Sequence, residues 1–196
     1  MRPATLDILH EEHAALAAML GSLSAMLARA RRDGVLPDFE VLRATLFYLD
    51  AFPGQLHHHK ESEWLFPAVR ERCPELAPVL DRLERDHAES EKLIRELEHS
   101  LLAFEVLGEP RRQAFEEAVQ PYIRSYLEHI AVEERDVLPA ARQALGEVDW
   151  ALLDAVFSIN RDPITGLEPE AEFKPLFRKL LQNLPAPGAT DGAPPA

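Results

Sequence analysis

The first long amphipathic segment of the chain, residues 6–27, reads LDILHEEHAALAAMLGSLSAML. Its leucines recur at alternating spacings of three and four residues, which is typical of a helix that buries one face. His13 occupies the one place in this series where a leucine is missing. The segment predicts a core helix over residues 5–32 with a histidine on its buried face, with Thr5 as its N-cap and Gly34 as its stop.

Three further segments show the same period. They cover residues 37–72, interrupted or kinked at Pro53-Gly54, residues 78–107 and residues 111–144. Proline and glycine mark the connections, and the sequence lacks the alternating β-branched runs and Asn-Gly turns that would indicate strands. Four long amphipathic helices with short connections predict an all-α fold, an antiparallel up-down four-helix bundle.

The remainder of the chain follows this bundle, which is assigned to residues 1–146. Two weaker helices are expected at residues 150–159 and 168–184, within a C-terminal extension of residues 147–184. Residues 185–196 are rich in proline, glycine and alanine, and this composition predicts a disordered tail.

Charge and cysteine content exclude several classes of protein. The 196 residues include 21 Lys and Arg against 34 Asp and Glu, a net charge of −13, so binding to nucleic acid or to an anionic membrane is not expected. No apolar run approaches the roughly 18–20 residues of a membrane span.

The single cysteine, Cys73, excludes an internal disulfide and a cysteine-based metal site. A cytoplasmic protein is expected, because no targeting segment is visible, and no feature identifies a protein partner.

An internal repeat relates the two halves of the bundle. The run LHEEHA at residues 9–14 matches LERDHA at residues 83–88, with an offset of 87 − 13 = 74 between the matching histidines of the two runs. Three positions recur 72 residues later, as the pairs His57/His129, Glu61/Glu133 and Pro67/Pro139. Each half is thus a helical hairpin, and the repeat predicts an approximate twofold axis with both halves facing one central site.

The repeated positions carry chemistry that a plain apolar core does not need. Residues i and i+4 share a helix face, so each His-x-x-x-Glu pair points in one direction. Burying this many polar side chains would cost several kcal/mol each unless something compensated them, and a metal site does so. The predicted metal ligands are His13, His57, Glu61, His87, His129 and Glu133.

Register selects His57 from a run of three consecutive histidines. Glu61 lies six residues before Pro67, and the same spacing recurs in the second half. The pair His59 and Glu63 has the same i, i+4 spacing but no counterpart there, so register does not select it as a ligand pair.

For the other polar residues on or near the buried helix faces, the sequence gives less definite predictions. His58 is either a group that supports a ligand from outside or a surface residue. His10 and His99 are expected to face solvent. Tyr122 and Tyr126 lie on the seam of the fourth helix, where they either pack or extend a hydroxyl to the site.

The donor atoms predict two metal ions. Four histidine nitrogens and four carboxylate oxygens make eight donors, which is too many for one first-row ion, whereas two octahedral ions offer twelve positions. If both glutamates bridge and a solvent-derived oxo or hydroxo group adds one ligand to each ion, one position per ion stays open. Histidine and glutamate donors suit iron, with manganese or zinc as less favoured choices.

In order and spacing, these six positions resemble the hemerythrin-like (HHE cation-binding) domain family, over about residues 5–145. The resemblance implies a non-haem di-iron centre, bridged by the two glutamates, with the four histidines as terminal ligands. Leu83 stands where oxygen-carrying members have a further histidine. The chain is therefore more similar to the bacterial members that repair iron centres or respond to nitric oxide. Residues 150–184 also resemble an extension found in some bacterial members of the family.

Three functions fit this pattern. The first is a di-iron protein that binds or reacts with O2, NO or peroxide, in an oxidative or nitrosative stress response or in iron-centre repair. The second is a non-enzymatic oxygen or NO sensor or store. The third is a structural bundle with zinc or without metal. The sequence singles out no catalytic residue, so it leaves open whether the protein is an enzyme.

Overall fold

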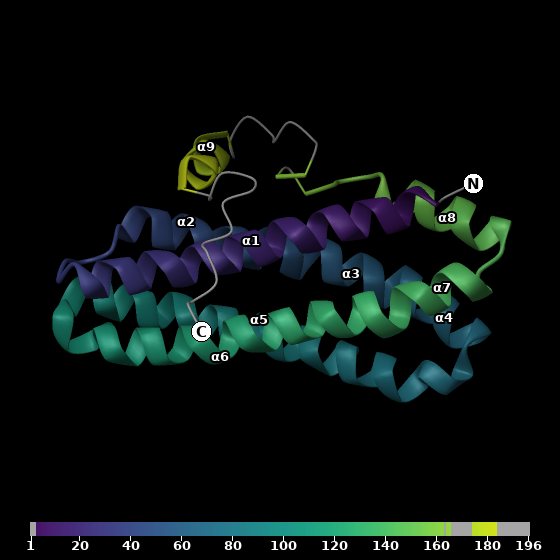
Figure 1. Ribbon diagram of the computed structural model, residues 1–196, viewed down its shortest axis with the longest axis horizontal. Coiled ribbons are helices and arrows are strands. Elements are labelled where there is room, and N and C mark those ends of the chain that lie inside the picture. The colour runs from purple at the N-terminus through teal and green to yellow at the C-terminus, as the bar shows by residue number, and fades with distance from the viewer. Residues whose placement is uncertain (1–2, 163, 166–173, 184–196) are drawn as a thin grey trace, which may run out of the picture.

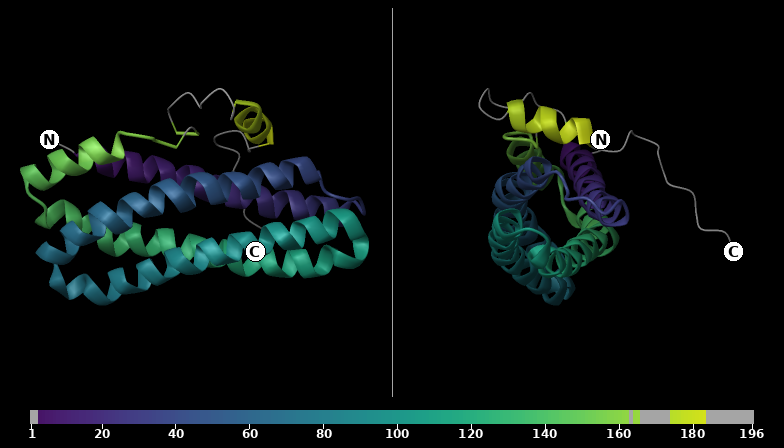
Figure 2. Two further views of the ribbon diagram at one scale, coloured as in Figure 1. Left: turned by 180° about the vertical axis from the view of Figure 1, so that it is seen from behind. Right: turned by 90° about the vertical axis from the view of Figure 1, so that its left-hand side faces the viewer.

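The computed structural model describes residues 3–162, 164–165 and 174–183. Within these residues every regular element is helical, which confirms the prediction of an all-α fold. Long helical rods lie side by side along the long axis of the molecule, and the short helix α9 lies across them (Figures 1 and 2).

The first two rods form the N-terminal half. The first is α1, Ala4–Arg32. The second is a chain of helical segments that follow one another without a loop: α2 (Phe39–Leu49), η1 (Asp50–His57), α3 (His58–Lys60), η2 (Glu61–Leu65) and α4 (Phe66–Arg72).

The second half repeats this arrangement. A short η3 (Pro74–Leu76) leads into α5 (Ala77–Leu107), and η4 (Glu109–Arg111) leads into the fourth rod. That rod consists of α6 (Arg112–Val132), η5 (Glu133–Val137) and α7 (Leu138–Ala144). The extension follows as α8 (Glu147–Phe157) and α9 (Lys174–Asn183).

The ends of the four rods agree with the sequence prediction to within two residues, whereas α8 begins and ends earlier than the predicted residues 150–159. The predicted cap of the first helix needs a further correction. Gly34 has a φ of 65°, in the left-handed region that glycine tolerates, directly after the end of α1. Thr5 is not the N-cap, because the helix already begins at Ala4. The backbone N–H and the hydroxyl of Thr5 instead donate to Asp154 Oδ1 of α8, at 2.8 and 2.6 Å. A tertiary contact has therefore replaced the local cap.

Three segments of the rods are π-helical. The interruption expected at Pro53-Gly54 is the π-helical η1, so the rod widens there and does not break. The other two segments begin at Glu61 and Glu133. The backbone carbonyl of each of these glutamates accepts a hydrogen bond from the backbone N–H of the residue five positions later. A proline follows each segment, at positions 67 and 139, and proline lacks the N–H that an α-helix would use. Wide turns of this kind are frequent at functional sites.

The buried apolar side chains form two clusters with a polar layer between them. On α1, Leu9 belongs to one cluster and Leu16 to the other, with the buried His13 between them. On α5, His87 lies between Leu83 and Ile94 in the same way. The apolar clusters stabilise the rods on both sides and fix the position of the polar layer.

The extension packs on the bundle. Its buried residues Trp150, Leu153 and Phe157 join one apolar cluster, and Phe177 and Leu180 join the other. Residues 166–173 and 184–196 lie outside the described residues, and with them the predicted start of the last helix and the predicted tail. The division of the chain at residues 146 and 184 stays a prediction.

One described helix, α1, is long and apolar enough to cross a membrane by length and composition. The mean hydropathy of its most apolar window is only 1.2, and the helix also buries Glu12 and His13. Its buried apolar face is that of a core helix, so no membrane span is indicated.

Candidate metal centre

The structure brings the six predicted ligands together in the polar layer. All six side chains are buried, with between 0% and 5% of each residue exposed. They come from all four rods, and four of them lie in or beside the π-helical turns: His57, Glu61, His129 and Glu133.

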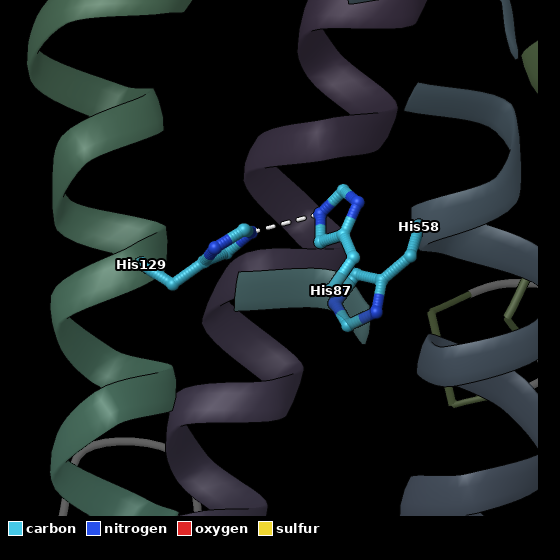
Figure 3. Close-up of side chains that lie close together, drawn as sticks. All are labelled: His58, His87 and His129. Carbon is cyan, nitrogen blue, oxygen red and sulfur yellow. Dashed lines mark hydrogen bonds between the residues drawn. The ribbon is translucent and has the colours of Figure 1, made fainter. Parts of the chain in front are cut away.

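The four histidines form two pairs whose Nε2 atoms face each other. His13 Nε2 lies 3.2 Å from His57 Nε2, and His87 Nε2 lies 3.1 Å from His129 Nε2. Figure 3 shows the second pair. Two neutral imidazoles that turn their Nε2 lone pairs toward each other repel, unless a proton or a metal ion lies between them.

Each glutamate extends one oxygen toward each pair. For Glu61, Oε1 lies 3.2 Å from His57 Nε2, and Oε2 lies 3.5 Å from His87 Nε2. For Glu133, Oε2 lies 3.3 Å from His13 Nε2 and Oε1 lies 3.2 Å from His129 Nε2. None of these four buried oxygens has a hydrogen-bond partner.

These donors fit a metal centre. Two groups of four side chains could each hold an ion; each group consists of one histidine pair and both glutamates. Buried carboxylates without hydrogen bonds are costly, and a bound cation compensates them. Because the two groups share both carboxylates, the site fits two neighbouring cations with nitrogen and oxygen donors.

The buried carboxylates and imidazoles shift one another's pKa values. Burial alone would raise the pKa of Glu61, but the facing His57 and His13 rings hold it well below its usual range. Burial alone would lower the pKa of His57, but Glu61 and Glu12 raise it to about 10. The pKa of His13 is likewise raised against the effect of burial, mainly by Glu133. The cluster therefore stabilises positive charge at its centre.

On the outward side, the rings of the first pair are held by carboxylates. His57 Nδ1 lies 2.8 Å from Glu12 Oε2, and His13 Nδ1 lies 2.7 Å from Glu134 Oε1. A ring that donates its Nδ1–H to a carboxylate keeps its Nε2 lone pair free for a metal ion and becomes a more basic ligand.

The second pair has weaker outer support. His87 Nδ1 lies 2.9 Å from the hydroxyl oxygen of Ser62. His129 Nδ1 lies 3.7 Å from Asp86 Oδ2, beyond hydrogen-bond distance, and has no hydrogen-bond partner. The two ion positions thus have matching inner donors and different outer surroundings.

Comparison with known proteins identifies the family. The family model of the hemerythrin HHE cation binding domain matches residues 4–141. The chain belongs to the hemerythrin HHE cation-binding family. The comparisons with curated proteins and with solved structures gave no significant match. The six inner donors of this hemerythrin-family chain all lie within the matched residues.

Sequence reasoning missed the four outer partners, although the repeat contains a signal for them. Each is adjacent in sequence to an inner donor, either before a seam histidine or after a glutamate. The repeat also pairs them, since 86 − 12 = 74 and 134 − 62 = 72 are the offsets already found for the inner donors. The four residues are Glu12, Ser62, Asp86 and Glu134.

His58 lies against the second histidine pair (Figure 3). Its ring stacks on His87 with centroids 4.1 Å apart, and its Nε2 lies 2.8 Å from the Tyr126 hydroxyl. Burial and the neighbouring His87 hold the pKa of His58 well below its usual value. A surface position is thus excluded, and His58, His87 and His129 form a third group that could hold an ion.

The remaining histidines lie outside the cluster. His99 is exposed, as expected, and His59 pairs with Glu63 at the surface. The expectation for His10 needs a correction, because its 42% exposed side chain does not face solvent alone. It lies one helical turn before His13, and its Nδ1 lies 2.9 Å from Glu134 Oε1.

Proposed function

We propose that this hemerythrin-family chain is a di-iron protein that binds or reacts with O2, NO or peroxide. The observation that carries the proposal is the pair of buried carboxylates, each placed between two histidine pairs and without a hydrogen-bond donor. In this proposal His13, His57, His87 and His129 bind the ions through Nε2, and Glu61 and Glu133 bridge them.

Iron is proposed over manganese and zinc because of the chemistry that the open positions would support. Histidine and carboxylate donors accept all three metals, but zinc has no redox chemistry. When bound, the iron pair supplies the electrons for reaction with a diatomic ligand or peroxide. The protein supplies donors whose negative charge offsets that of the cations, and a core that excludes bulk water.

The space beside the cluster favours a very small ligand. One cavity of about 10 Å³ touches His58, Tyr126 and His129, and its walls also include Ser90 and Ser125. A cavity of this size has room for about one water molecule. O2, NO and peroxide are of comparable size, whereas an organic substrate would require the rods to move apart.

The proposal also includes the topology of the helical bundle, the cellular location of the protein and its biological role. Short connections between successive rods support an antiparallel up-down four-helix bundle. The lone buried Cys73 supports a cytoplasmic location, and small reactive ligands support a role in oxidative or nitrosative stress or in iron-centre repair.

An optical titration tests this function. Anaerobic, iron-reconstituted protein is expected to contain two irons per chain and to change its absorption spectrum on addition of O2, NO or H2O2. Continued consumption of the ligand would identify an enzyme, and full reversal on its removal would identify a sensor or a store. Iron-loaded protein whose spectrum responds to none of the three would contradict the proposal.

A further inference from the structure

The loop that follows α8 is anchored on the second rod by a buried lysine. Lys60 Nζ donates to the carbonyl oxygens of Ile159 and Asn160, at 2.7 and 3.0 Å. Only 8% of Lys60 is exposed, and an ammonium group at such a position requires partners. Asn160 has a φ of 49°, a left-handed conformation that costs energy and that these contacts hold in place.

Asp162 connects the same loop to the bundle at two further points. Its backbone N–H donates to Glu12 Oε1 at 3.2 Å. Its carboxylate accepts a hydrogen bond from the Tyr48 hydroxyl and a 2.8 Å bond from the backbone N–H of Ile164. Asp162 is 7% exposed, so these contacts lie inside the protein.

Glu12 links Asp162 to a proposed metal ligand. Its Oε1 accepts from the loop, and its Oε2 accepts the Nδ1–H of His57. Both carboxylate oxygens of Glu12 thus accept a hydrogen bond, which fixes the orientation of this carboxylate and of the His57 imidazole. The cavity beside these side chains and Lys60 measures about 10 Å³, so the loop is closed over the ring with room for no more than one water molecule.

The other half of the bundle lacks such a support. Asp86 is the repeat equivalent of Glu12, but its carboxylate lies 3.7 Å from His129 Nδ1 and makes no hydrogen bond to it. The residues of the C-terminal extension lie beyond the 4–141 family match, so this support comes from outside the matched domain.

We propose that the loop over residues 158–162 positions His57 for metal binding, through the backbone of Asp162 and the carboxylate of Glu12, with Lys60 and Tyr48 as its anchors. The inference rests on the proposed function in that it takes His57 as a ligand. Outer partners of metal-bound histidines commonly change metal affinity by about 10–100-fold, and here the outer partner is itself held by the extension.

Tyr48→Phe in the full chain tests the positioning role. It removes the hydroxyl that donates to Asp162 and keeps the ring that packs against Phe52 and Phe177. The matched control is Thr5→Val, which also removes one hydroxyl that donates to an aspartate of the extension, but that aspartate, Asp154, binds the start of α1, whereas Glu12 binds Asp162 and His57. Lys60→Met is a second test variant, because it releases the carbonyls of residues 159 and 160.

The readouts are the release of Co²⁺ to a chelator and the hyperfine-shifted imidazole N–H signals in the proton NMR spectrum. We expect about tenfold faster release from Tyr48→Phe and Lys60→Met. We also expect faster solvent exchange of one N–H signal, that of His57. This signal is assigned as the one whose chemical shift changes in Glu12→Gln. Thr5→Val should match the parent protein in both readouts.

The outcomes separate this inference from the proposed function. Failure of the parent protein to bind Co²⁺ would contradict the metal site itself. Normal Co²⁺ binding, with parental release and exchange rates in Tyr48→Phe, would overturn the positioning role and leave the metal site intact. If Lys60→Met does not fold, as judged by its circular dichroism, Tyr48→Phe alone decides.

Discussion

Replacement of Glu61 by glutamine is expected to cost the protein both metal ions. Glu61 faces both histidine pairs, so the substitution removes the negative charge that both ion positions share and replaces one of the two oxygen donors by an amide nitrogen that does not bind metal. A metal site with four donors has a binding free energy of about 10–16 kcal/mol, which is about 3 kcal/mol per donor. The loss of one donor therefore lowers the affinity for an ion roughly a hundredfold. Elemental analysis after desalting should show iron falling from about two per chain to well below one.

Glu63→Gln is the matched control for this variant. Glu63 lies two residues away and pairs with His59 at the same i, i+4 spacing, but both side chains are more than half exposed. It should retain the parental iron content. Equal iron content in the two variants would show that the buried pair is not a ligand pair.

Metal loading is expected to raise the melting temperature by about 10–20 °C. An ion present at a hundred times its dissociation constant stabilises the folded state by about 2.7 kcal/mol, so two ions contribute about 5 kcal/mol. A chain of this size shifts by about 2–4 °C per kcal/mol. The physical source is the buried cluster, whose four carboxylate oxygens have no hydrogen-bond partner without a cation.

Differential scanning calorimetry of the same preparation, with metal and with an excess of chelator, measures this shift. Glu61→Gln should melt at the same temperature under both conditions, because it cannot hold the ions that produce the shift. A parent protein whose melting temperature is independent of metal would contradict a cation-stabilised core.

The helices and the convergence of the six candidate ligands could be predicted because both follow a period. Leucines at helical spacing indicate the buried face of α1, and the gap in that series places His13 on it. The repeat then distinguishes His57 from His59, which occupies a surface position in the structure. Periodicity and repetition are properties of the sequence alone, so neither required the tertiary structure.

Features that depend on contacts between distant residues could not be predicted in this way. Thr5 satisfies the local rule for an N-cap, but Asp154, 149 positions away, accepts its hydrogen bonds. The contact between Asp162 and Glu12 spans 150 positions and lies in a loop without period. Pro67 signals a missing backbone donor, but the local sequence does not say whether the rod bends, breaks or widens into a π-helical turn.

Anomalous diffraction at the iron edge, from crystals of the iron-reconstituted protein, tests the central claim most directly. The account predicts two peaks in the polar layer, roughly 3.5 Å apart. One peak should lie between His13 and His57 and the other between His87 and His129, with both glutamates contacting each. A single peak, or iron bound away from these side chains, would contradict the di-iron assignment.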